Sequence, residues 1–176
     1  MSNPKSRNQP DTYNGDFWLN QNCGTPNRDN DYCGVHRNSG ILNHWFYLLA
    51  EGSSNTDQIN DNLATFNIAG IGKDKAAKIV YRAQTIYFTP TTDYEDARMY
   101  TIQAAEDLFG QFSVEASITC QSWFAVGIGN NNCFDNVRII GNPSVCYSNP
   151  TTYNLNGSTS NINVTWSVSS NLQIVS

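Results

Sequence analysis

Four stretches between residues 38 and 127 carry apolar side chains at helical spacing, and this periodicity restricts the fold more than any other feature of the sequence. In the first stretch, Ile41, Trp45, Leu48 and Leu49 fall on one face of a helix with 3.6 residues per turn. Four such helices make a helical bundle. The sequence therefore predicts a mainly α fold, with helices over residues 38–52, 72–88, 92–110 and 113–127.

Residues that typically start or stop helices bound these stretches. Asn38 or Ser39 can cap the first helix through a side-chain oxygen. Pro90 ends the second helix, because proline cannot continue one. The pattern Thr92-x-x-Glu95 predicts a capping box at the start of the third. These signals support the same four boundaries as the periodicity.

The remaining segments lack helical periodicity. Turn-forming residues recur throughout residues 1–37, which predicts a loop, and residues 53–71 read as a polar loop that closes in a short strand in ATFNIAGIG. After Gly129 the only charged residues are Asp135 and Arg138. Short strands are expected in this tail over residues 136–141, 151–155, 163–170 and 172–176.

The tail resembles the first part of an immunoglobulin-like module, a partial β-sandwich that is cut short. Two domains are therefore expected, a helical domain over residues 1–129 and a β-rich domain over residues 130–176.

Two function classes are excluded on composition. The 10 Lys and Arg residues are scattered in a chain of net charge -5, so no basic stripe predicts nucleic-acid binding, and no apolar run reaches the ~18 residues of a membrane span.

The cysteines indicate the compartment. The chain has 5, without a CxxC pair or a Cys/His cluster of zinc-finger spacing. In a chain poor in charge and rich in Asn, Ser and Thr, disulfides in an oxidising compartment are the better interpretation, which predicts a secreted, extracellular or cell-surface protein. The odd cysteine either stays free or pairs outside this sequence.

Five motifs in order resemble the C-terminal helical domain of thermolysin-like zinc metallopeptidases. They are DYCGVHRNSGILN, GIGKDKAAKIVYRA, YFTPTTDY, AEDLFG and WFAVGIG, and the resemblance covers residues 1–129. It implies that His36 donates a hydrogen bond to the oxyanion of the tetrahedral intermediate and that Asp31 orients its imidazole. Where the family usually has the first of two glycines, this chain has Cys33, and a Cys23–Cys33 disulfide is the hypothesis that follows.

The same residues also have purely structural interpretations, without any catalytic role. His36 on its own could be an exposed or capping histidine, and Asp31 a turn former in a loop rich in them. His44, the second of the chain's 2 histidines, lies among aromatic residues and is assigned to packing, with no ligand role.

The resemblance also implies what this chain does not supply. The family's zinc-binding motif, His-Glu-x-x-His, does not occur in the sequence, and the third zinc ligand, the substrate-clamping arginine and most calcium sites of the family precede the matching segment. Zinc and possible calcium are thus expected in the intact parent protease and no bound metal in this fragment, which alone should be inactive. The expected partners are a peptide or protein substrate, the missing N-terminal zinc-binding domain, and a second copy through the exposed interdomain face. The alternative is a non-enzymatic helical binding module with an adhesion or sorting β tail.

Overall fold

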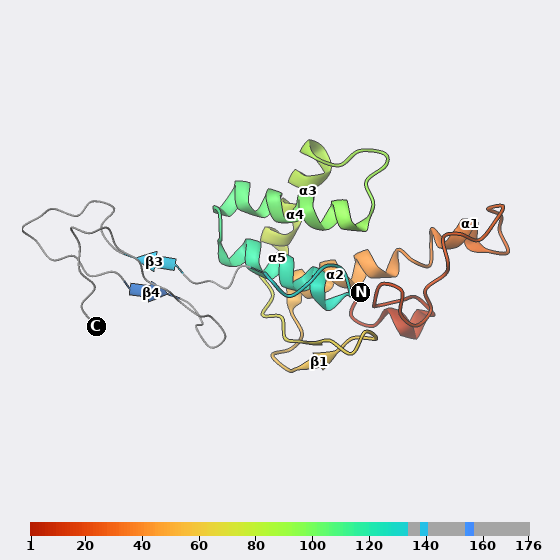
Figure 1. The fold of residues 1–176 in the computed structure, drawn as a ribbon, viewed down its shortest axis with the longest axis horizontal. Helices are drawn as coiled ribbons and strands as arrows, with labels where there is room; N and C mark the ends of the chain where they lie inside the picture. The colour runs from red at the N-terminus through yellow and green to blue at the C-terminus, as the bar shows by residue number, and fades with distance from the viewer. Residues whose placement is uncertain (134–137, 141–153, 157–176) are drawn as a thin grey trace, which may run out of the picture. The chain divides into compact units, whose positions relative to one another are not determined.

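The computed structural model describes residues 1–133, 138–140 and 154–156. The chain divides into two compact units, Met1–Phe134 and Asp135–Ser176. The first unit contains η1 (Pro4–Arg7), α1 (Asp31–Gly34), α2 (Gly40–Glu51), β1 (Gln58–Ile59), β2 (Thr65–Phe66), α3 (Lys73–Ile86), α4 (Tyr94–Phe109) and α5 (Val114–Ala125) (Figure 1). The second contains β3 (Arg138–Ile140) and β4 (Asn154–Asn156).

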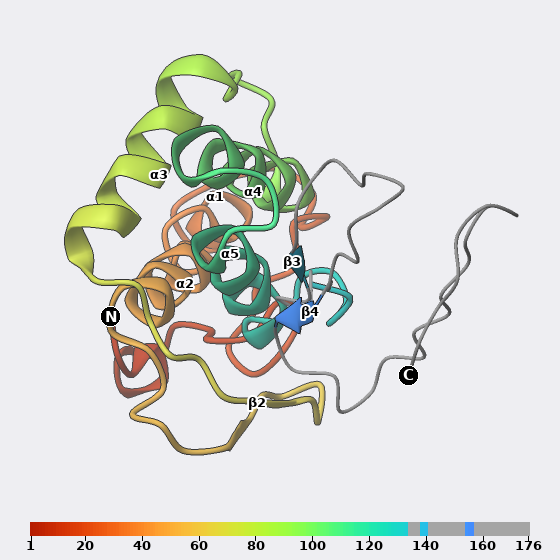
Figure 2. The ribbon, with the colours of Figure 1, turned by 90° about the vertical axis from the view of Figure 1, so that its left-hand side faces the viewer.

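The four predicted helices are confirmed as α2 to α5, and the mainly helical fold with them. Figures 1 and 2 show α2 and α5 adjoining in the middle of the unit, with α3 and α4 on one side and the β1–β2 hairpin on the other. The indole rings of Trp45 in α2 and Trp123 in α5 stack at a centroid distance of 4.5 Å, and both residues are buried. Burial of two such large aromatic side chains makes this contact the centre of the core.

A second buried cluster joins α3, α4 and α5. It buries mainly alanines, with Ala83, Ala104, Ala105 and Ala116 around Ile79. Small side chains let helix backbones approach closely. The bundle therefore has one aromatic region and one alanine-rich region.

Two predicted helix starts were wrong in detail. The capping box of α4 is formed by Asp93 and Asp96: Asp93 Oδ1 accepts the Asp96 N–H at 2.9 Å, and Asp96 Oδ2 accepts the Asp93 N–H at 3.5 Å. Thr92 is displaced from this role because its hydroxyl accepts the N–H of Thr89 and closes the preceding turn. At α2, Ser39 occupies the N-cap position but makes no side-chain capping bond.

The predicted loops contain short regular elements. Residues 1–37, expected to be loop throughout, include η1 and the four-residue α1, and the strand expected in ATFNIAGIG is β2, which pairs antiparallel with β1. In the second unit β3 and β4 pair antiparallel with Ile139 opposite Leu155. The strands predicted over 163–170 and 172–176 lie outside the described residues, so the immunoglobulin-like interpretation stays a prediction.

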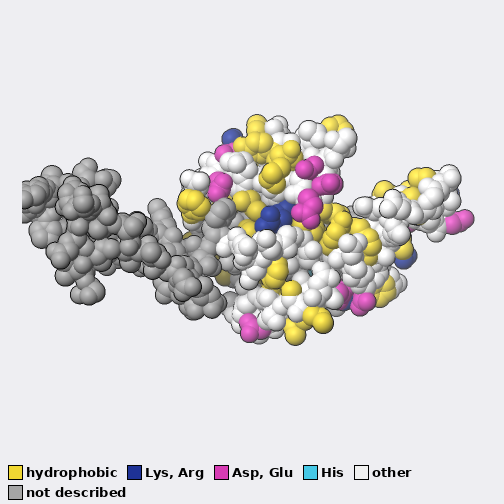
Figure 3. All heavy atoms as spheres, in the orientation of Figure 1, with side chains coloured by type: hydrophobic (Ala, Val, Ile, Leu, Met, Phe, Trp, Pro, Cys, Tyr) yellow, Lys and Arg dark blue, Asp and Glu magenta, His cyan; other side chains and the backbone are white. Residues whose placement is uncertain are grey.

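The surface agrees with the charge pattern of the sequence. On the face in Figure 3, the described Lys and Arg side chains are few and separate. Within the part of the chain that the structure describes, no helix is long and apolar enough to cross a membrane. Several large apolar side chains are exposed, among them Tyr81, Ile86 and Met99. Self-association through an apolar face stays a prediction.

Candidate active site

The loop that precedes α2 contains a left-handed turn. Asp31, Tyr32 and Cys33 have φ of 53°, 52° and 64°, and Gly34 follows with φ of 85°. Left-handed backbone is disfavoured for residues with a Cβ and normally occurs at single positions. Three consecutive non-glycine residues in this conformation therefore require other interactions to hold them.

Covalent and polar contacts hold the turn. Cys23 and Cys33 form a disulfide, which confirms the pairing expected from the sequence. The Asn30 side chain accepts the backbone N–H of Asn27 at 2.9 Å and that of Cys33 at 3.3 Å. The buried Asn38 side chain bonds both the N–H and the carbonyl oxygen of Leu19. These two bonds connect the segment around Leu19 to the start of α2.

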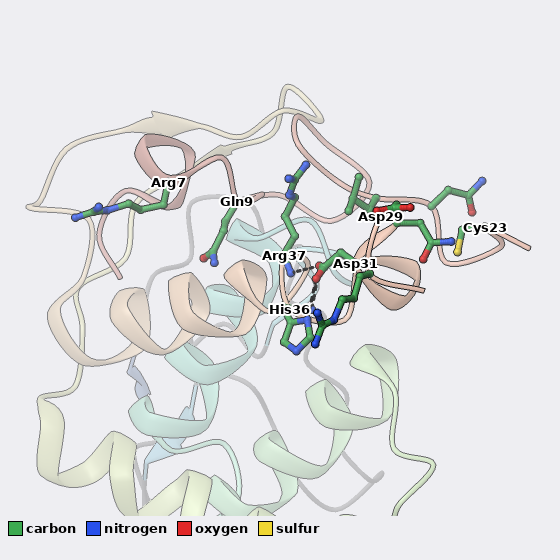
Figure 4. A pocket seen from close by; sticks show the side chains of 11 residues that line it. Arg7, Gln9, Cys23, Asp29, Asp31, His36 and Arg37 are labelled. Atoms are coloured by element: carbon green, nitrogen blue, oxygen red, sulfur yellow. Dashed lines mark hydrogen bonds and ion pairs between the residues drawn. The ribbon is translucent and has the colours of Figure 1, made fainter. Parts of the chain in front are cut away.

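The Asp31 carboxylate is surrounded by donors from the residues that follow it. Its Oδ2 accepts the backbone N–H groups of His36 at 3.2 Å and Arg37 at 2.8 Å, and its Oδ1 lies 2.8 Å from Nδ1 of His36 (Figure 4). The N–H of Arg37, and next the His36 imidazole, hold the pKa of Asp31 below its ordinary value. The carboxylate is therefore ionised at neutral pH, has no proton to give, and must accept one from Nδ1.

The His36 imidazole extends into solvent from this anchor. Its side chain is 75% exposed, against 26% for Asp31, and the Tyr32 ring approaches it edge-on at 6.2 Å between centroids. No partner for Nε2 is recorded among the described residues. With a proton fixed on Nδ1, protonation at Nε2 gives an imidazolium whose second N–H points away from the carboxylate and is free to donate.

A cavity of about 530 Å³ opens beside this pair. Figure 4 shows Asp31 between the Arg37 and His36 side chains, with Arg7 and Gln9 contributed by the N-terminal segment. The full lining is Arg7, Gln9, Leu19, Asn20, Cys23, Arg28, Asp29, Asn30, Asp31, His36 and Arg37. A second cavity, of about 390 Å³, lies against Tyr32, Val35 and Tyr94.

The first compact unit matches a known family over almost its whole length. The family model described as the thermolysin metallopeptidase, alpha-helical domain, matches residues 1–128. This chain belongs to that family.

Curated proteases are similar to this chain over 128 residues. Bacillolysin of Bacillus cereus is 41% identical over 73% of this chain and 20% of its own length. Thermolysin of Alicyclobacillus acidocaldarius subsp. acidocaldarius is 38% identical with the same coverage, and neutral protease B of Bacillus subtilis (strain 168) is 35% identical over 21% of its length. The chain thus spans about a fifth of the length of the curated relatives it matches.

His44 lies apart from this site. It is 8% exposed, its Nδ1 is 3.1 Å from the carbonyl oxygen of Met1, and its ring stacks near Tyr47. Burial lowers the pKa of His44 from its ordinary value, which favours the neutral imidazole. These contacts fit the packing role expected from the sequence.

The described residues do not suit the zinc that thermolysin-family membership implies. They contain no group of three His, Cys, Asp or Glu side chains that could hold a metal ion. Structural and catalytic zinc sites use at least three such protein ligands. No step of the chemistry is therefore assigned to a metal held by this part of the chain.

The sequence indicated Asp31 and His36 but not the groups that support them. The left-handed turn gives no periodic signal in the sequence. The side-chain hydrogen bonds of Asn30 and Asn38 give none either, since all of these depend on contacts between neighbouring loop segments. The three arginines of the cavity, Arg7, Arg28 and Arg37, are also far apart in the sequence and form no motif.

Proposed function

We propose that this chain is the C-terminal helical domain of a secreted zinc metalloendopeptidase that hydrolyses peptide bonds. Its contribution to the reaction is His36, which donates a hydrogen bond to the oxyanion of the tetrahedral intermediate, and Asp31, which orients that imidazole. The proposal rests on family membership and on the observed pair. The single observation that carries it is the 2.8 Å contact between Asp31 Oδ1 and His36 Nδ1, which leaves Nε2 exposed beside the cavity.

The geometry suits an oxyanion donor for a physical reason. When a peptide carbonyl is attacked, negative charge develops on its oxygen, and a fixed N–H donor stabilises that charge more than the neutral carbonyl of the substrate. The donor must be held before the reaction begins, and Asp31 holds it with an ionised carboxylate that is itself fixed by two backbone N–H groups.

The zinc of the intact protease would be held by residues that this chain does not contain, and any calcium sites would lie there as well. We therefore expect the 176-residue chain alone to be inactive. Secretion agrees with the two disulfides, Cys23–Cys33 and Cys120–Cys133, because disulfides persist in oxidising compartments. The residues after Phe134 would begin an adhesion or sorting module.

The deciding experiment is zinc-dependent cleavage of a generic peptide by the full-length protease and by its His36→Ala variant. Loss of one oxyanion donor lowers kcat by roughly 10²–10³-fold. His44→Gln is the matched control, because it changes the other histidine of the chain, which lies in the core and away from the cavity. The control is expected to lower thermal stability while retaining kcat at a temperature where it is folded.

Asp31→Asn separates orientation from donation. An amide can accept with its oxygen but presents an N–H₂ group where the carboxylate accepts a second donor, so the imidazole loses its fixed tautomer. A kcat decrease of roughly 10–100-fold is expected, smaller than that of His36→Ala. Wild-type activity in both variants, or absence of zinc-dependent cleavage by the full-length protein, would favour the non-enzymatic binding module instead.

A further inference from the structure

We propose that the cavity beside His36 binds a carboxylate group of the peptide substrate through Arg28 and Arg37, with Arg7 at its edge. The proposal rests on the proposed function, since it assigns substrate preference to the same site. A carboxylate offers two oxygens in one plane, which the planar guanidinium fork of arginine matches better than any other side chain does.

Four of the six other cations of the helical unit form ion pairs with carboxylates. Lys5 contacts Asp11, Asp16 and Asp61, while Lys73 pairs with Glu51, Lys75 with Glu115 and Arg82 with Asp107. For Arg7, Arg28 and Arg37, no ion pair with any described residue is recorded. Three of the 10 Lys and Arg residues of the chain therefore line one cavity with their charge unneutralised by described partners.

The acidic side chains of the cavity do not cancel this charge. Asp31 is occupied by the imidazole of His36 and by two backbone N–H groups, so its oxygens already accept three donors. Asp29 is the other acidic lining residue. With three arginines against the ionised carboxylates of Asp29 and Asp31, the lining keeps a formal excess of one positive charge in a chain whose net charge is -5.

Two of the guanidinium groups belong to the segment that holds the catalytic pair. Arg28 lies inside the loop closed by the Cys23–Cys33 disulfide, and the backbone N–H of Arg37 donates to Asp31. Figure 4 shows the Arg37 side chain on the opposite side of Asp31 from the imidazole. Anchoring a binding group before the ligand arrives reduces the entropy lost on binding.

In this arrangement the arginines bind a carboxylate next to the scissile peptide bond, not the atoms of the bond itself. With the scissile carbonyl at His36 Nε2, a carboxylate a residue or more away along the peptide would reach the arginines. Two sources supply such a group: an Asp or Glu side chain, or the carboxylate at the end of a short peptide.

Substrate cleavage by the full-length protease distinguishes these sources and tests the proposal. We compare kcat/KM for four peptides that differ only at one residue, Glu or Gln, and at the C-terminus, free acid or amide. Because the groups are exposed to solvent, a preference of roughly three- to tenfold is expected for the charged member of a pair. It should decrease between 0.1 M and 1 M salt, as the Debye length falls from about 10 Å to about 3 Å.

The variants Arg28→Gln and Arg28→Lys identify the residue responsible. Arg28→Gln should reduce the ratio of kcat/KM for the Glu peptide over the Gln peptide, and Arg28→Lys should restore part of it. Lys78→Gln removes an exposed positive charge on α3, outside the cavity lining, and should leave the ratio unchanged. An equal fall in Arg28→Gln and Lys78→Gln would mean that net charge decides the preference, which overturns the site.

A binding measurement keeps the test independent of activity. In NMR titrations of the 176-residue chain with N-acetyl-Ala-Glu-Ala amide, the side-chain N–H signals of Arg28 and Arg37 should shift, and the Gln analogue should shift them less. Equal responses to both peptides, or equal kcat/KM values for charged and neutral substrates, would overturn the proposal. The second result would arise if these arginines pair with carboxylates in another part of the protease. Loss of activity in His36→Ala tests the proposed function separately.

Discussion

At the scale of single residues, the position of His36 depends on a backbone conformation that its own sequence disfavours. Asp31, Tyr32 and Cys33 are all left-handed, and the carboxylate of the first of them anchors the imidazole. The Cys23–Cys33 disulfide and the bonds to Asn30 offset this preference. Cys33 is the position where the opposing effects can be separated, because it carries both the left-handed backbone and the tether.

Two double variants separate strain from tethering. Cys23→Ser with Cys33→Ser removes the disulfide and keeps a Cβ at φ of 64°, so the free energy of unfolding should fall by about 3 kcal/mol. Cys23→Ser with Cys33→Gly removes the same disulfide but relieves the left-handed strain, and should be more stable than the serine variant by about 1 kcal/mol. Urea denaturation measures both. Equal stability of the two variants would contradict the strained turn.

His44 makes the stability of the domain depend on pH. Burial is the main cause of its lowered pKa; the bond to the Met1 carbonyl and the charge of Asp11 oppose it, and the N-terminal amine and Lys5 add to the decrease. The unfolded chain binds a proton near the ordinary value of 6.5, before the folded chain does. The contribution of the neutral His44 imidazole to the free energy of unfolding is therefore fully present above that pH. It is lost as the pH falls through the pKa that His44 has in the folded chain.

The expected result is a denaturation midpoint that decreases between pH 7.5 and pH 5 in the wild-type chain and decreases less in His44→Gln. The two proteins differ only at residue 44, so the difference between the two slopes isolates His44. Identical slopes would show that His44 is not buried in its neutral form.

At the scale of elements, a buried hydrogen bond joins α4 to α5. The Trp123 indole N–H donates to the Thr101 hydroxyl at 2.8 Å, and that hydroxyl donates to the carbonyl of Ala97 at 2.7 Å. Thr119 is buried to the same degree, but among the described residues its hydroxyl bonds the carbonyl of Glu115 in its own helix and no other helix. The two threonines form a matched pair that differs in whether another helix depends on them.

Thr101→Val should lower the free energy of unfolding by about 1–3 kcal/mol, because it leaves the Trp123 N–H buried without an acceptor. Thr119→Val removes a donor from a carbonyl in the same helix and should change stability by less than about 1 kcal/mol. Thermal denaturation of both variants gives the comparison. A similar effect in the two would mean that the bond between α4 and α5 contributes little.

At the scale of the whole molecule, a disulfide extends the helical unit past its last helix. Cys120 in α5 is bonded to Cys133, and the first compact unit ends at Phe134. The domain boundary expected after residue 129 stays a prediction, but a chain cut there would lose Cys133 and leave the buried Cys120 unpaired. We therefore expect the segment that ends in Cys133 to contribute to the stability of the helices.

Truncation tests this contribution. A chain of residues 1–134 should unfold with a free energy about 3 kcal/mol above that of residues 1–129, since the disulfide closes a loop of 13 residues. Circular dichroism during urea denaturation measures both. Reduction of both chains should bring the two midpoints together, and midpoints that agree before reduction would contradict the role of the Cys120–Cys133 disulfide.

The sequence by itself determined the four long helices and the Cys23–Cys33 pairing, and it predicted the roles of Asp31 and His36. Helical periodicity and the family motifs are local patterns, and each can be recognised from residues close together in the chain. Only the tertiary structure decided the shift of the α4 capping box to Asp93, because Thr92 is engaged by the preceding turn. It also decided the left-handed turn and the gathering of Arg7, Arg28 and Arg37, since these depend on how one loop folds against another, which no single stretch of sequence records.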